Sequence, residues 1–83
     1  MVDFVCVSWI DAENASGWVS GSEIAAYKHA LVHTVGWIAQ RDKKRISLAQ
    51  CISVDESGSP HWCSIMHIPI GMVKKVKKMA DPR

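Results

Sequence analysis

The segment Arg45–Val54, which reads RISLAQCISV, decides the fold class of this chain. Its large apolar residues are Ile46, Leu48, Ile52 and Val54, and they alternate with small or polar residues. Side chains along a β-strand point alternately to the two sides of a sheet, so a period of two predicts a strand with one buried face. Only Gln50 interrupts the apolar face.

The segment before it is ambiguous between helix and strand. Apolar residues at helical spacing allow one helix over residues 23–40, which would make the fold α+β. Residues 32–38 are instead rich in β-branched and aromatic types and include Gly36, a composition that favours a strand. We predict a strand over residues 31–40, joined to the next by a four-residue turn at 41–44 that fits a hairpin.

The C-terminal third contains a second hairpin and a basic tail. Residues 55–60 form a polar turn, and a strand follows over residues 61–68. Pro69 is expected to end this strand or to mark it as an edge, because proline has no N–H to donate. In the tail, Val73, Val76 and Met79 are spaced by three. This spacing fits either a helix with a lysine face or a single turn followed by a short strand.

The N-terminal third contains one strand and a long connection. Phe4–Ile10 is rich in β-branched and aromatic residues and is predicted to be a strand. Residues 11–22 are rich in Gly and Ser and are predicted to be a loop, in which Trp18 plugs the end of the fold. Ser22 is expected to cap a short helix over residues 23–28.

Length and composition restrict the class of protein. The chain has 83 residues, 48% of them hydrophobic, which predicts one small globular domain over residues 1–83. No run of about 18 apolar residues is present, so no transmembrane helix and no membrane partner are expected. Three cysteines without a preceding signal peptide predict reduced thiols in the cytoplasm.

The sequence contains no catalytic signature. His61, Cys63 and His67 share one face of the third strand, but they lack the paired spacing of zinc modules and are interpreted as a surface histidine pair beside a small thiol. No nucleophile is placed beside a base, and so short a chain has little room for a ligand cavity. We therefore predict no enzymatic activity, no metal, no cofactor and no small-molecule substrate.

The positive charges are concentrated in two clusters, although the net charge is only +2. The first is the turn Arg41, Lys43, Lys44 and Arg45, and the second is the tail Lys74, Lys75, Lys77 and Lys78. Such clusters are able to bind phosphates, and they also serve as ordinary solubilising charges. Together with Trp18 and Trp62, they are the candidate contacts for a protein partner or a nucleic acid.

Several short motifs resemble a family of small uncharacterised phage and prophage proteins. They are Val7-Ser8-Trp9-Ile10-Asp11, Gly17-Trp18, Val35-Gly36-Trp37-Ile38 leading to Asp42, Ile46-Ser47-Leu48-Ala49, Ile68-Pro69 and Val73-Lys74-Lys75-Val76. The resemblance implies a small barrel in a bacterial or phage-infected cytoplasm, without an established activity. The order of bent strands and a final turn also looks like SH3-like and Sm-like barrels.

These observations predict an all-β fold, a five-stranded SH3-like or Sm-like barrel with a short helical turn. Its core is expected to contain Val5, Val7, Val35, Ile46, Leu48, Ile52, Val54, Ile65 or Met66, Ile68, Val73 and Val76. The predicted function is non-enzymatic protein interaction, including self-association, because open strand edges are templates for another chain. The alternative is RNA or DNA binding through the two basic clusters.

Overall fold

The structure, a computed structural model, describes residues 2–12 and 17–83 and contains one five-stranded antiparallel sheet. Its elements, in chain order, are β1 (Phe4–Ile10), α1 (Gly21–Ala26), β2 (Leu31–Arg41), β3 (Arg45–Val54), β4 (Pro60–Pro69), η1 (Ile70–Met72) and β5 (Val73–Lys78). The all-β prediction is confirmed. The choice of a strand over residues 31–40 is confirmed as well, because β2 occupies this stretch and α1, which precedes it, has only six residues.

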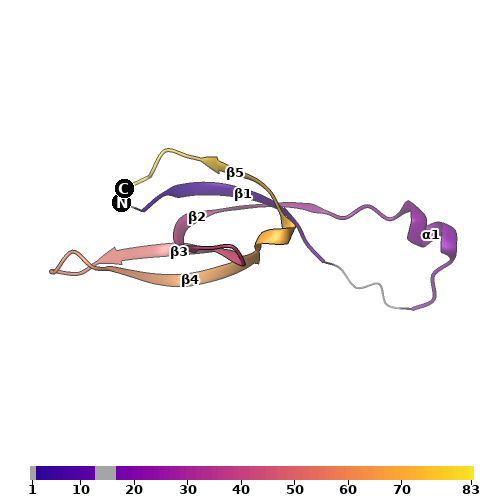
Figure 1. Cartoon of the computed structure of the whole chain (residues 1–83), viewed down its shortest axis with the longest axis horizontal. Helices are drawn as coiled ribbons and strands as arrows, with labels where there is room; N and C mark the ends of the chain where they lie inside the picture. The colour runs from indigo at the N-terminus through magenta and orange to yellow at the C-terminus, as the bar shows by residue number, and fades with distance from the viewer. Residues whose placement is uncertain (1, 13–16) are drawn as a thin grey trace.

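The strand order is β4-β3-β2-β1-β5, so β4 and β5 are the two edges. The five strands of the predicted barrel are present, but within the described residues no pairing joins β4 to β5, so the sheet stays open and does not close into a barrel. Proline at position 69 ends the ladder of β4, and η1 then turns the chain so that β5 pairs with β1. Figure 1 shows β1 and β5 above β3 and β4, with β2 curving from the upper layer, where it pairs with β1, into the lower layer, where it pairs with β3.

The core lies between these two layers. It is built from Val5 and Val7 of β1, Ile46 and Leu48 of β3, and Ile68 of β4, each at most 3% exposed. Because β1 and β3 are not neighbours in the sheet, their contact shows that the sheet bends over onto itself. Half-buried apolar residues pack around this cluster: Trp9, Ile38, Val73 and Val76.

The bend requires a close approach of β2 to β3 at Gly36. A Cβ at this position would lie 2.7 Å from the backbone oxygen of Ala49 and 3.3 Å from the Leu48 Cβ. The Gln50 side chain fixes the approach by donating a 2.7 Å hydrogen bond to the Val35 backbone oxygen. Glycine is therefore the residue that lets the backbone of β2 approach β3 this closely.

Part of the predicted core is exposed. Val35 is 38% exposed, Val54 56%, and Ile65 and Met66 43% each. Val35 and Ile65 lie on the outer face, whereas Val54 and Met66 lie on the inner face. Val54 is the last residue of β3, where the β3–β4 hairpin runs beyond β1 and β5 (Figure 1), and Met66, opposite Leu48, has its sulfur 3.9 Å from the Thr34 hydroxyl of β2. An apolar face is buried only where a second layer covers it, so strand periodicity overestimated the core.

The structure corrects the predicted helix cap and decides between the two alternatives for the basic tail. The helix begins at Gly21 with Ser20 as its N-cap, not Ser22, and the Ser20 hydroxyl accepts a 3.2 Å hydrogen bond from the Glu23 N–H. The basic tail follows the second of its two alternatives, a single turn and then a strand. In β5 the two valines, Val73 and Val76, face the core and the lysines stay exposed.

Candidate functional site

A long connection between β1 and β2 projects from one end of the sheet. We call its described residues 17–30 the arm; all of them are exposed, and α1 buries none of its side chains. The arm makes the molecule 58 Å long although it is only 24 Å by 22 Å across (Figure 1). The sequence identified a loop with a short helix, but not that this loop stands away from the core.

The arm carries large apolar side chains in water. Trp18 is 103% exposed, Ile24 63% and Val19 45%, and the first residue of β2, Leu31, is 53% exposed. The expectation that Trp18 plugs the end of the fold is therefore wrong, and its place among the candidate contact residues agrees with this exposure. Isolated exposed hydrophobics are common, but a contiguous exposed apolar segment marks an interaction surface.

The first basic cluster lies on the tight turn between β2 and β3. The Asp42 carboxylate accepts hydrogen bonds from the N–H groups of Lys44 (2.8 Å) and Arg45 (3.0 Å). These backbone donors hold the pKa of Asp42 below its usual value. The Ile70 N–H donates a 2.9 Å bond to the Lys44 oxygen, which fastens this turn to η1. Arg41, Lys43, Lys44 and Arg45 all remain exposed.

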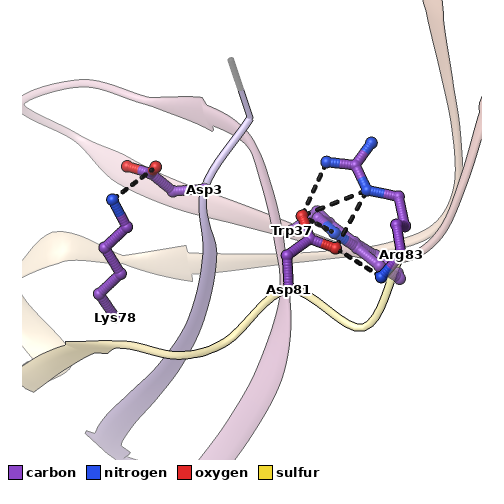
Figure 2. A network of polar contacts seen from close by, with 5 residues as sticks. All are labelled: Asp3, Trp37, Lys78, Asp81 and Arg83. Atoms are coloured by element: carbon purple, nitrogen blue, oxygen red, sulfur yellow. Dashed lines mark hydrogen bonds and ion pairs between the residues drawn. The ribbon is translucent and has the colours of Figure 1, made fainter.

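The second basic cluster lies along the edge strand β5. Lys74, Lys75, Lys77 and Lys78 are exposed. Lys78 is 3.7 Å from Asp3, an exposed ion pair that contributes little to stability (Figure 2). β5 begins directly after η1, and η1 is bonded to the turn that carries the other cluster. The four lysines also protect this edge from pairing with another strand.

The sequence did not predict a polar and aromatic contact at the C-terminus. The Trp37 indole N–H donates to the Asp81 carboxylate at 3.2 Å, and the Arg83 guanidinium lies 5.7 Å from the centre of the Trp37 ring (Figure 2). Phe4 packs against the same ring, with 4.9 Å between ring centres. Arg83 also binds Asp81 at 2.7 Å, and these bonds lower the pKa of Asp81. No local pattern signals a contact between residues more than forty positions apart.

The histidines bind separate partners. His67 is 2.6 Å from the hydroxyl of Ser47, His33 is 2.7 Å from that of Ser8, and His61 is 2.9 Å from the Asp55 carboxylate. Between residues 2 and 12 and from 17 onward, no three His, Cys, Asp or Glu side chains come together as a metal site. These hydrogen bonds link neighbouring strands or close the β3–β4 hairpin.

The remaining candidates are a cysteine pair and a shallow depression. Cys51 and Cys63 are exposed free thiols directly opposite each other on β3 and β4. The depression, of about 270 Å³, lies where the arm meets η1 and is lined by residues that include Ile10, His29 and Met72. Its volume is below the range of about 300–1,000 Å³ that is usual for small-molecule sites.

Trp62, the second tryptophan proposed as a contact, is half-buried on β4 opposite Ile52. The structure places it on the β3–β4 hairpin, which points away from the arm (Figure 1). The two tryptophans and the two basic clusters therefore do not form a single surface.

Comparison of the chain with protein-family models, with curated proteins and with solved structures found no match. The resemblance to small phage proteins thus rests on the short motifs alone. In the part of the chain that the structure describes, no helix has both the length and the apolarity to cross a membrane.

Proposed function

We propose that this chain is a non-enzymatic protein-interaction module that binds a protein partner, another copy of itself included, through the arm. The observation that carries the proposal is the exposure of Trp18 and Ile24 on a segment that packs against none of the core residues. Burying one such side chain on a partner contributes about 1.5–3 kcal/mol. Tryptophan is also among the residue types that contribute most to binding at protein interfaces.

Affinity capture from the lysate of the native host tests this function. The tagged wild-type chain is compared with a double variant, Trp18→Ser with Ile24→Ser, and with the control Lys28→Ser, which changes a polar residue of the arm. We expect one partner to be retained by the wild type and the control and lost by the double variant. Binding of that purified partner is then titrated directly. Equal retention by all three proteins would contradict the proposal.

An SH3-like or Sm-like fold in a bacterial or phage-infected cytoplasm is proposed for the same molecule. Its support is the strand order β4-β3-β2-β1-β5, the long connection between β1 and β2, and the η1 turn directly before the last strand. Small barrels of these types are frequent binding modules, although a fold alone does not determine a function.

Nucleic-acid binding is the second candidate function, because the bond between Ile70 and Lys44 brings the basic turn close to the start of β5. Titration of labelled mixed oligonucleotides at about 50 mM and about 200 mM salt tests it, since phosphate contacts weaken steeply with salt. We expect Lys43→Ser with Lys44→Ser to weaken such binding and Lys28→Ser to leave it unchanged. Absence of binding at the lower salt concentration would exclude this candidate.

A further inference from the structure

The molecule exposes more surface than a single compact chain of its size. Its accessible surface is 6297 Å², whereas a compact monomer of 9.2 kDa exposes about 4,900 Å². Its radius of gyration is 16.6 Å, against about 12 Å for a compact domain of this length. The excess of about 1,400 Å² is close to two halves of a standard protein interface, each of about 800 Å².

Part of this excess surface is an uncovered stretch of the inner sheet face. On β3 and β4, Ile52 pairs with Trp62, and Val54 and Met66 lie on the same face at either side of this pair. We call these four residues the hairpin patch. Val54 and Met66 are 56% and 43% exposed, and the other two are half-buried.

The hairpin patch continues the face of Leu48, which is fully buried under β1. Within one chain, β1 covers Leu48, but Val54 at the end of β3 is left exposed. A sheet face of this kind is stable when another apolar segment covers it.

We propose that the arm of one copy covers the hairpin patch of a second copy; this contact rests on the proposed function of the arm and names its partner. The arm has the apolar side chains that the patch needs, Trp18, Val19 and Ile24. The arm and the β3–β4 hairpin point to opposite ends of the molecule, so they meet between chains and not within one (Figure 1).

Charge does not oppose a contact between the arm and the hairpin patch. Residues 17–30 contain one acid, Glu23, and one base, Lys28, so the arm is neutral, whereas the turn beside the patch carries Asp55 and Glu56. Apolar burial, and not charge attraction, therefore drives the proposed contact.

An arm-on-patch contact uses two different surfaces of each chain. It closes a dimer when both arms are exchanged, and it forms a ring or a filament when each chain binds the next one. In each of these assemblies a chain buries one arm and one patch, which accounts for an excess surface of about two half-interfaces. A mass measurement identifies the assembly.

Mixing two defective variants tests the contact. The arm variant, Trp18→Ser with Ile24→Ser, keeps an intact patch, and the patch variant, Val54→Ser with Met66→Ser, keeps an intact arm. We expect the wild type to be oligomeric by light scattering and each variant alone to be monomeric. Mixed in equal amounts, the two variants are expected to form a dimer, because one intact arm and one intact patch remain.

Lys28→Ser is the matched control and is expected to be oligomeric like the wild type. Circular dichroism checks that each variant keeps its strands, and Val54→Ser alone replaces the double patch variant if that protein unfolds. A monomeric wild type, an arm variant that stays oligomeric, or a mixture that stays monomeric would each overturn the inference. A monomeric wild type whose arm still captures a different protein would leave the proposed function intact, so the two failures are distinguishable.

Discussion

At the scale of single residues, Gly36 is the position where the fold depends most on the size of a side chain. The Cβ of any other residue would approach the Ala49 backbone oxygen to 2.7 Å, and a backbone atom moves only together with its strand. We expect Gly36→Ala to lower the free energy of unfolding by about 1–3 kcal/mol, the usual cost of forcing extra atoms into a packed site.

Urea denaturation of Gly36→Ala beside Gly71→Ala measures this cost. Gly71 is the matched control, because a Cβ there meets no atom within 4 Å. Equal stability of the Gly36→Ala variant and the wild type would show that β2 and β3 separate at this point without cost.

A second residue-scale prediction concerns Asp55 in the turn between β3 and β4. Its carboxylate accepts hydrogen bonds from the Ser57 hydroxyl (2.5 Å), from His61 (2.9 Å) and from the Ser59 N–H (2.9 Å). With the Ser57 hydroxyl as the largest cause, these bonds lower the pKa of Asp55 to about 2. In the unfolded chain the pKa of an aspartate is about 3.9.

Because the folded state holds the Asp55 proton more weakly, its contribution to stability is present above about pH 4. It is lost as the pH falls toward 2. We expect Asp55→Asn to be less stable than the wild type at neutral pH and to lose less stability during acidification. Thermal melts between pH 6 and pH 2, with Glu56→Gln as the control in the same turn, measure this difference. Parallel pH profiles of Asp55→Asn and the wild type would contradict it.

At the scale of elements, the register between β3 and β4 places two thiols opposite each other. Directly opposed residues of antiparallel strands have Cα atoms about 4.5–5.5 Å apart, within the range that disulfides span. Cys51 and Cys63 are such a pair, and both are exposed to an oxidant.

We expect oxidised glutathione to convert these two thiols into an intrachain disulfide. One thiolate attacks the glutathione disulfide and releases glutathione, and the second thiol then displaces the glutathione bound to the first. Intact mass should fall by two hydrogens, and peptide mapping should link residues 51 and 63. Cys6→Ser is the control and should react in the same way. Accumulation of glutathione adducts without the intrachain link would show that the two sulfur atoms do not meet.

At the scale of the whole molecule, the exposed arm and the hairpin patch connect stability to association. A contact made only between folded chains stabilises the folded state more as the concentration rises. We therefore expect the midpoint of thermal unfolding to rise with chain concentration in the wild type and to be constant in the double arm variant Trp18→Ser with Ile24→Ser. Differential scanning calorimetry over a hundredfold concentration range measures this, and a constant midpoint in the wild type would argue against self-association.

The sequence by itself determined the features that depend on neighbouring residues. The period of two in Arg45–Val54 predicted β3, the polar turn at Asp55 predicted the second hairpin, and the composition of residues 32–38 correctly favoured a strand. Strand alternation and turn chemistry are properties of adjacent residues, so they can be read without knowledge of the fold.

Only the tertiary structure decided which apolar faces are covered. Val54 and Leu48 have the same place in the strand pattern, yet Leu48 is fully buried and Val54 is 56% exposed, because β1 and β5 cover only part of β3. The exposure of Trp18 and the contact between Trp37 and Asp81 likewise depend on where distant segments lie. Burial is set by the layer opposite a strand, and the strand's own sequence does not state where that layer ends.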